Sequence, residues 1–198
     1  MTFAETTPKS TQKRLNAMHS LYGSGDPERD RARRNIAKSM ISPGTDRPQE
    51  IYTPQSVIDV VLATFGEIVL DPCSGPDSIV PARIKYDGTA EQWDGLLSRW
   101  FRKTYFNPPY KNLRDWLIKA DAEASQARPI IGLFPVRPHR KWFRDLLLNR
   151  SGVEIVYLDP LKFRGYDQAF PAPLCLVLWC TDSEMIRRFL TASKALSK

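Results

Sequence analysis

The sequence predicts an α/β fold, with a parallel sheet covered by helices on both faces. From residue 51 onward, short apolar segments of strand length alternate with segments whose apolar residues recur at helical spacing. Strands separated by helices favour parallel pairing, because each connection crosses over the sheet to reach the next strand. The chain has 198 residues, of which 42% are hydrophobic, and this suits one domain with a substantial core.

Four segments are predicted to be helices and five to be strands. Thr53 and Pro54 open the first helix, whose apolar residues form one stripe. The predicted helices are residues 55–65, 114–127, 141–149 and 183–196, and the predicted strands are residues 67–70, 104–106, 130–134, 154–158 and 174–180. Ligands bind at the carboxyl ends of strands in such sheets, which directs attention to Asp71 and Asn107.

The first 50 residues differ in composition from the rest of the chain. They are polar and rich in Pro, Gly, Ser, Thr and Arg. Asp26 and Pro27 are typical of a helix start, and a Pro-Gly pair ends the basic stretch that follows. We therefore predict a polar, basic arm with short helices over residues 1–50 and a folded domain over residues 51–198.

Composition narrows the class of partner and the compartment. The formal net charge of +7 and the pI near 9.4 favour a polyanionic partner, although many basic proteins bind no nucleic acid. Three cysteines without a pair motif and two scattered histidines argue against a metal site. The longest apolar run, residues 171–180, is half the ~20 residues of a membrane helix, and the N-terminus lacks a signal pattern. We expect a cytoplasmic protein that does not enter membranes.

The most specific segment is Asn107-Pro108-Pro109-Tyr110, which directly follows an apolar strand. Two consecutive prolines fix φ and remove two backbone donors, so the loop is stiff. It presents two acceptors, the Asn107 side-chain oxygen and the Pro108 carbonyl, to the two N–H donors of an exocyclic amine. Accepting both hydrogens frees the nitrogen lone pair to attack a methyl sulfonium, while Tyr110 stacks on the flat ring. The alternative is a Pro-Pro turn whose Asn caps the next helix.

A second polar segment, Asp71-Pro72-Cys73-Ser74-Gly75, follows the first predicted strand. An acidic residue at a strand end, followed by a turn of small residues, suits a ligand with an α-amino group. S-adenosylmethionine has such a group and a sulfonium charge. The segment lacks the spaced glycines of a dinucleotide-binding loop, which argues against a pyrophosphate-containing cofactor. The alternative is an ordinary turn, because Asp-Pro and Ser-Gly are common turn dipeptides.

These motifs, in this order, resemble those of the phage-type DNA N-6-adenine methyltransferases. The resemblance covers about residues 50–180 and is carried by Tyr52-Thr53-Pro54, Leu70-Asp71-Pro72, Asp94-Gly95-Leu96 with Trp100, Asn107-Pro108-Pro109-Tyr110, Phe134-Pro135-Val136-Arg137, Trp142-Phe143, Leu161-Lys162-Phe163-Arg164-Gly165 and Pro171-Ala172-Pro173. The Asn-Pro-Pro-Tyr segment alone is shared with RNA and protein-glutamine methyltransferases. Its spacing from Asp94 and Trp100 is more particular to this family.

The resemblance implies a Rossmann-like methyltransferase sheet, with residues 51–198 as the catalytic domain. Only 31 residues separate Gly75 from Asn107, so we expect the second and third strands of that sheet to be abbreviated. The implied activity is S-adenosylmethionine-dependent methylation of the N6 amine of adenine in DNA, by base flipping and direct methyl transfer.

The resemblance also implies roles for individual residues. Those that hold the flipped adenine are Asn107, Pro108, Pro109 and Tyr110. Those that line the cofactor pocket are Tyr52, Thr53, Pro54, Asp71, Pro72, Cys73 and Ser74. The residue that reaches the adenosine half of the cofactor is Asp94, with Asp87 as a competing candidate.

Two basic segments are candidates for phosphate contacts. One follows the strand 130–134 and interleaves cations with Trp142 and Phe143, which are expected to face the core. The other lies between the last two strands, where a hairpin beside the target pocket is expected. The predicted nucleic-acid contacts are Arg137, Arg140, Lys141, Lys162 and Arg164. The alternative is that these charges simply face water.

Two other functions remain alternatives: methylation of adenine in RNA, and DNA binding by a catalytically idle relative. Cofactor binding measured by calorimetry separates the idle relative from both enzymes. Competition between duplex DNA and RNA substrates separates the two enzymes.

Overall fold

The computed structural model describes residues 52–90, 93–124, 128–164 and 168–197. The arm predicted over residues 1–50 lies outside them.

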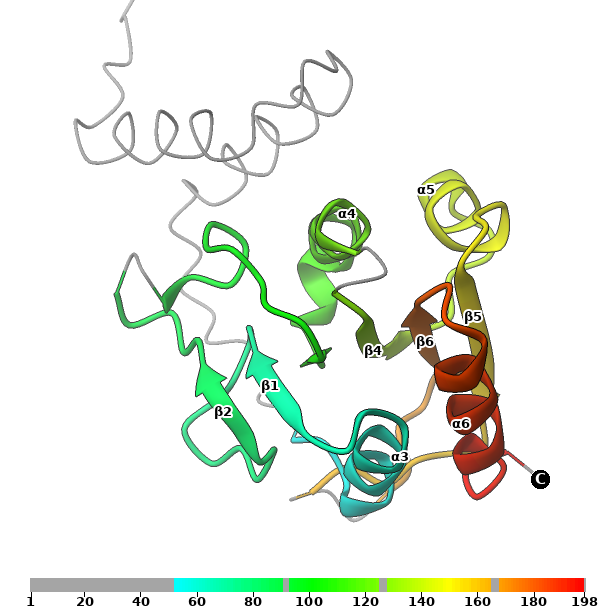
Figure 1. Cartoon of the computed structure of the whole chain (residues 1–198), viewed down its shortest axis with the longest axis horizontal. Coiled ribbons are helices and arrows are strands. Elements are labelled where there is room, and N and C mark those ends of the chain that lie inside the picture. The colour runs from blue at the N-terminus through cyan, green and yellow to red at the C-terminus, as the bar shows by residue number, and fades with distance from the viewer. Residues whose placement is uncertain (1–51, 91–92, 125–127, 165–167, 198) are drawn as a thin grey trace, which may run out of the picture. The chain divides into compact units, whose positions relative to one another are not determined.

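A six-stranded sheet with the order β2-β1-β3-β4-β6-β5 forms the centre of the described residues (Figure 1). The strands are β1 (Ile68–Asp71), β2 (Ala82–Lys85), β3 (Thr104–Phe106), β4 (Ile130–Pro135), β5 (Val153–Leu158) and β6 (Leu174–Trp179). All five predicted strands are present, each within one residue of its predicted ends.

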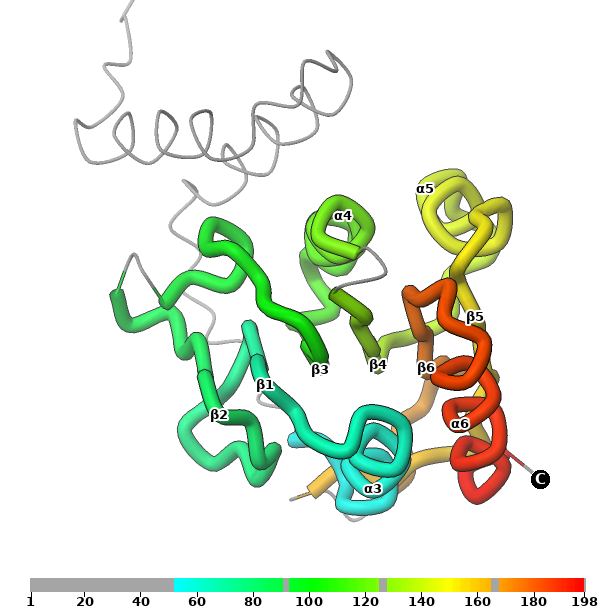
Figure 2. The backbone as a smooth tube through the Cα atoms, in the orientation of Figure 1, coloured from blue at the N-terminus to red at the C-terminus, as the bar shows by residue number. Residues whose placement is uncertain are grey.

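Helices cover both faces of the sheet (Figure 1, Figure 2). On one face lie α3 (Gln55–Phe65) and α6 (Ser183–Ser193), and on the opposite face lie α4 (Leu113–Glu123) and α5 (Lys141–Phe143). The predicted α/β fold is therefore confirmed. No helix in the described part of the chain is long and apolar enough to cross a membrane.

Local sequence explains where several helices begin and end. α3 starts after Pro54, whose φ is −67°, and ends at Gly66, which adopts a left-handed φ of 76°. The side chain of Asp182 caps α6 by accepting a hydrogen bond from a first-turn N–H. The helix predicted over residues 141–149 is present over residues 141–148, where the short α5 continues as a π-helical segment, Arg144–Leu148.

Strand directions correct one prediction. β1, β3 and β4 run parallel, as predicted, and β2 runs parallel to β1, but β6 runs antiparallel to both β4 and β5. The described residues between β5 and β6, 159–164 and 168–173, contain no helix. Because no helix carries the chain across the sheet there, it returns directly beside β5, and antiparallel pairing follows.

The segment between β1 and β3 contains β2, a strand that the sequence prediction missed. The described part of residues 72–103 holds this one strand and no α-helix. Arg83 and Lys85 alternate with apolar residues in β2, and the strand lies at the edge of the sheet with half of its residues exposed. So short and basic a segment carries little strand signal.

The two faces of the sheet carry different cores. The face under α3 and α6 is mainly aliphatic, with Val57, Val61 and Leu176 fully buried. The face under α4 is aromatic: the ring centroids of Trp100 and Phe106 lie 5.2 Å apart. Successive residues of a strand face opposite sides, so Tyr105 belongs to the aliphatic side and Phe106 to the aromatic side.

Candidate functional site

The polar motifs gather at one edge of the sheet. β1, β3 and β4 run parallel, so their carboxyl ends lie together, and we call this the carboxyl edge. Asp71 is the last residue of β1, Asn107 follows β3, and Arg137 lies two residues beyond β4. The described parts of the connection between β5 and β6, residues 159–164 and 168–173, also lie at this edge, because β6 runs antiparallel to β4.

The Asp71 loop, residues 71–75, holds a buried carboxylate. Asp71 is only 4% exposed. Its Oδ1 accepts a hydrogen bond from the Cys73 N–H at 3.2 Å, and its Oδ2 accepts one from the Ser78 hydroxyl at 3.4 Å. Among the described residues, no Lys, Arg or His nitrogen lies within the 4.0 Å of an ion pair with this carboxylate. Burial therefore dominates and raises the pKa of Asp71 to about 6.

Backbone contacts fix the Asp71 loop to the neighbouring strand and to Tyr52. The Tyr86 N–H donates to the Asp71 carbonyl, and the Ser74 N–H donates to the Tyr86 carbonyl, both at 2.9 Å. A Cβ at Gly75 would lie 3.0 Å from Cε1 of Tyr52, so the Tyr52 ring packs closely on this loop. The structure thus brings Tyr52 and the Asp71 loop together.

The Asn107 loop, residues 107–110, holds a neutral amide between two hydroxyl groups. The Asn107 Nδ2 donates to Thr53 Oγ1 at 3.4 Å, and the Tyr110 hydroxyl donates to Asn107 Oδ1 at 3.1 Å. Thr53 Oγ1 lies 2.9 Å from the Tyr105 hydroxyl oxygen in a buried hydrogen bond. Sequence reasoning missed Tyr105, because a tyrosine in an apolar strand gives the same signal as an ordinary core residue.

The Tyr110 ring packs against the connection between β5 and β6. Tyr110 and Phe170 make an edge-on contact with centroids 5.4 Å apart, and Phe170 in turn packs on Phe163. Burial raises the pKa of the Tyr110 hydroxyl above its usual value. Leu161 and Phe163 are buried in the aliphatic core, so they anchor this connection.

Cys73 is the point at which the two loops meet. Its sulfur lies 3.8 Å from Asp71 Oδ1. Burial raises the pKa of the Cys73 thiol well above its usual value, and a hydrogen bond from the Asn107 backbone N–H opposes that shift only in part. The same thiol therefore contacts a group from each loop.

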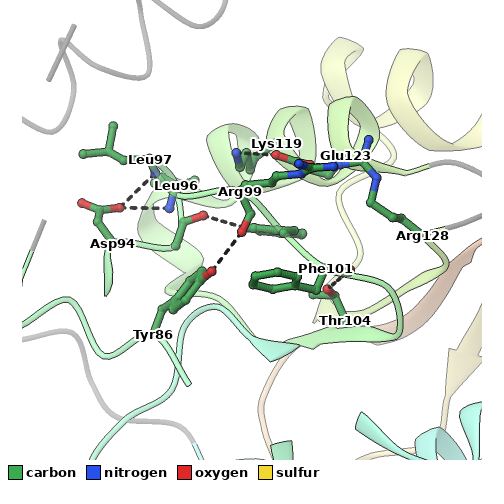
Figure 3. A network of polar contacts seen from close by, with 12 residues as sticks. Tyr86, Asp94, Leu96, Leu97, Arg99, Phe101, Thr104, Lys119, Glu123 and Arg128 are labelled. Atoms are coloured by element: carbon green, nitrogen blue, oxygen red, sulfur yellow. Dashed lines mark hydrogen bonds and ion pairs between the residues drawn. The ribbon is translucent and has the colours of Figure 1, made fainter. Parts of the chain in front are cut away.

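Asp94 supports the Asp71 loop from a neighbouring turn. Figure 3 shows Asp94 turned toward Leu96 and Leu97, whose N–H groups donate to its Oδ1 at 2.9 and 3.2 Å. A Cβ at Gly95 would lie 1.7 Å from the Pro72 carbonyl oxygen, so only glycine fits where this turn meets the loop. The Asp-Gly-Leu motif thus has a structural explanation: a capped turn pressed against the backbone of Pro72.

Asp87, the competing candidate for contact with the adenosine half of the cofactor, lies directly at the carboxyl edge. It comes two residues after β2 and is exposed. Its Oδ1 accepts hydrogen bonds from the N–H and the hydroxyl of Thr89, which lower its pKa.

A buried ion cluster that the sequence analysis did not single out lies on α4. Glu123 is 2% exposed, and its two oxygens accept from Lys119 at 2.7 Å and Arg128 at 2.5 Å (Figure 3). Lys119 and Glu123 are four residues apart on one helix, a spacing that signals such a pair. The cluster ties the end of α4 to the residues before β4, far along the chain from either loop.

The predicted phosphate contacts differ in their surroundings. Arg137 is half-buried, while Arg140, Lys141, Lys162 and Arg164 are exposed. Lys141 forms an ion pair with Asp145. The Arg164 backbone N–H donates to the Tyr52 carbonyl at 3.3 Å, and its guanidinium donates to the Asp77 carbonyl at 3.3 Å, so this cation lies just beyond the Asp71 loop. Phe143 is fully buried as expected, and Trp142 is half-buried.

The described residues include no group of three or more His, Cys, Asp or Glu side chains that could hold a metal ion.

Comparison with protein families matches residues 45–167 to the model for DNA N-6-adenine-methyltransferase (Dam). The matched region is more than half of the chain and includes both loops. No curated protein matches the chain.

Proposed function

The chain belongs to the DNA N-6-adenine-methyltransferase (Dam) family, and we propose that it transfers a methyl group from S-adenosylmethionine to the N6 amine of adenine in DNA. The observation that carries the proposal is the meeting of the two loops at Cys73. The buried Asp71 carboxylate, which forms no ion pair within the described residues, and the Asn107 backbone N–H both contact the Cys73 thiol there.

The groups around Asp71 fit the amino-acid end of S-adenosylmethionine. A buried carboxylate that accepts only from neutral donors has an unmet preference for a cation. The α-ammonium of the cofactor satisfies that preference, and the Tyr52 ring together with Cys73 and Ser74 would line the same pocket. When bound, the cofactor supplies a methyl group activated by a sulfonium charge.

Asn107 and Pro108 are the proposed acceptors for the target amine. An amine offers two N–H donors, which the Asn107 Oδ1 and the Pro108 carbonyl would accept together. Holding both hydrogens leaves the nitrogen lone pair available for methylation, and Tyr110 would stack on the ring. Because Pro108 is buried and Asn107 half-buried, an adenine inside a duplex must leave the base stack to reach them.

We interpret the sheet as an abbreviated Rossmann-like methyltransferase sheet, which fits the proposed function. The parallel strands β2, β1, β3 and β4 bring their carboxyl ends to one edge, where such sheets bind ligands. We assign the ribose hydroxyls to Asp87 rather than Asp94. Each carboxylate accepts two hydrogen bonds within its own turn, but Asp87 is exposed at that edge, whereas Asp94 is half-buried.

DNA would approach the carboxyl edge along exposed cations. Arg140 and Lys141 follow β4, and Lys162 and Arg164 lie on the connection that packs against Tyr110. Arg137 precedes both groups in sequence and is half-buried. Cations around a pocket supply affinity for phosphates, while the pocket supplies the choice of base.

Mass analysis of nucleosides tests the proposal directly. DNA from a bacterial strain without adenine methylation is incubated with the protein and S-adenosylmethionine, then digested. We expect N6-methyldeoxyadenosine with the wild type and almost none with Asn107→Ala. A parallel incubation with RNA tests the RNA alternative. Absence of methylated adenine in DNA, together with normal cofactor binding, would refute the proposal.

A further inference from the structure

The resemblance places Thr53 in the cofactor wall, but its contacts give it another role. We propose that Thr53 is a positioning residue, which with Tyr105 holds the Asn107 amide so that its oxygen faces the target amine. The inference rests on the proposed function and gives a positioning role in it to two residues, of which Tyr105 was missed by sequence reasoning. It depends on three side-chain contacts.

An asparagine amide can serve as an acceptor only when its oxygen faces the target. The oxygen and nitrogen ends of the amide have nearly the same size, so shape alone does not choose between them. In this protein the Asn107 nitrogen is bonded to Thr53 Oγ1, which leaves Oδ1 at the opposite end. The Tyr110 hydroxyl donates to that oxygen and so occupies the position that an amine N–H would take.

Entry of the target changes the balance of these restraints. When an amine N–H replaces the Tyr110 hydroxyl on Oδ1, the contact between that hydroxyl and the amide is given up. The contact with Thr53 remains, because it lies at the other end of the amide. Thr53 therefore continues to hold the orientation of Asn107 while the base is bound.

Thr53 is itself held by rigid, buried surroundings. It is 5% exposed, and its partner Tyr105 is fully buried in β3, two residues before Asn107. Thr53 lies immediately ahead of Pro54 and α3, whose apolar side chains fill the aliphatic core. Hydrogen bonds in such surroundings are strong and fix geometry closely.

Tyr52, the residue before Thr53, contacts the other loop. The Tyr52 ring packs on Gly75 of the Asp71 loop, whereas the Thr53 hydroxyl is directed to Tyr105 and Asn107. Adjacent residues thus serve different loops: Tyr52 serves the cofactor side and Thr53 the target side.

The test compares Thr53→Val with Thr53→Ser and with a matched control, Thr64→Val. Thr64 is fully buried, and its hydroxyl donates to the Val60 carbonyl within α3 at 2.8 Å, so the control removes a buried hydroxyl away from the site. The measurements are kcat and KM on unmethylated bacterial DNA, the Kd for S-adenosylmethionine, and thermal unfolding.

We expect Thr53→Val to lower kcat about tenfold, the scale of one hydrogen bond, with both KM and the cofactor Kd within about twofold of the wild type. Thr53→Ser restores kcat to within about threefold, because the hydroxyl returns. Thr64→Val keeps kcat. Tyr105→Phe lowers kcat in the same direction by about threefold, and adding it to Thr53→Val lowers kcat little further, because the two hydroxyls act as one unit.

Unchanged kcat in a folded Thr53→Val variant would overturn the inference, as would an equal loss of kcat in Thr64→Val. A loss of cofactor affinity at unchanged kcat would return Thr53 to the cofactor wall. If Thr53→Val does not fold, Thr53→Ser and Tyr105→Phe test the inference instead. An unchanged kcat in Tyr105→Phe would contradict a role for the hydrogen-bonded hydroxyls of Tyr105 and Thr53 in positioning Asn107. A wild type that methylates no adenine refutes the proposed function itself, and this inference with it.

Discussion

Two loops leave the same edge of the sheet but hold their polar groups in opposite ways. The Asp71 loop buries a carboxylate among neutral donors and is fixed by backbone hydrogen bonds to the residue after β2. The Asn107 loop presents a neutral amide and is fixed by side-chain hydroxyls and two prolines. The difference indicates what each loop binds: an unbalanced buried charge favours a cation, and an oriented amide oxygen favours a neutral donor.

The largest effect is expected in the Asn107 loop. Asn107→Ala should lower the rate of methyl transfer about 100- to 1,000-fold, because a fixed hydrogen-bonding group at the reacting centre is removed. Single-turnover kinetics with saturating cofactor measure the rate, and calorimetry should give an unchanged Kd for S-adenosylmethionine. Asn112→Ala is the matched control, since Asn112 is exposed and its side chain makes no capping bond. Near-normal turnover in Asn107→Ala would remove this loop from the chemistry.

The Asp71 loop should respond in binding rather than in rate. Asp71→Ala removes the carboxylate that we propose faces the cofactor's positive groups, and should weaken S-adenosylmethionine binding about ten- to more than a hundredfold. Calorimetric titration measures this. Asp77→Ala, an exposed acidic residue just beyond the same loop, should bind normally. Unchanged affinity in a folded Asp71→Ala variant would mean that the cofactor binds elsewhere.

Titration of Asp71 sharpens the same contrast. Its pKa is raised to about 6, and only the ionised form attracts a cation, so cofactor affinity should fall about tenfold per pH unit below pH 6 and level off above it. The effect on the free protein has the opposite sign. Because folding raises this pKa, folded Asp71 holds its proton more tightly than unfolded Asp71 does. The free energy of unfolding of the free protein should therefore fall as the pH rises from about 4 to about 6, by on the order of 3 kcal/mol.

Asp71→Asn is the control for both effects. The variant should bind cofactor weakly at every pH and should unfold at a higher temperature than the free wild type at pH 8. A pH dependence of cofactor affinity that persists in Asp71→Asn would assign the titration to another group.

A smaller effect is expected where the Asp71 loop packs against Gly95. Gly95→Ala places a methyl group against the Pro72 carbonyl, where no flexible side chain can move aside. Overpacking of this kind typically costs about 1–3 kcal/mol, so we expect a lower unfolding temperature and weaker cofactor binding. Denaturant unfolding measures the change. Normal stability would show that the turn and the loop can separate.

The smallest effects are expected at the exposed cations. Arg140→Ala with Lys141→Ala should weaken DNA binding about equally across sequences. It should also flatten the plot of log affinity against log salt by up to about two units, near 0.9 per lost phosphate contact. Arg187→Ala with Arg188→Ala removes the same charge from α6, which follows the opposite end of β6, and should leave the slope unchanged. Equal slopes for all three proteins would place the DNA elsewhere.

What the sequence predicted well depended on strong local signals. The stripe of α3 and the apolar runs of β4 and β6 gave those elements to within a residue. Asp71 and Asn107 could be identified as strand-end residues because each directly follows an apolar run. Parallel pairing then placed both at one edge.

The misses were features that depend on tertiary contacts. β2 is short, basic and at the sheet edge, so it carries little periodic signal. The direction of β6 depends on a connection without a helix. The contact of Gly95 with Pro72 forms only in the folded chain, and the bond between Thr53 and Tyr105 joins residues 52 positions apart. No local pattern encodes such contacts.

A crystal structure of the protein with S-adenosylhomocysteine, the demethylated product, tests the division between the two loops most directly. We predict that the α-amino nitrogen lies within about 3 Å of an Asp71 carboxylate oxygen and that the sulfur faces the Asn107 loop. The Asn107 Oδ1 should make no contact with the ligand. A ligand bound at another edge of the sheet, or one held by Asn107 while Asp71 touches no part of it, would contradict this division.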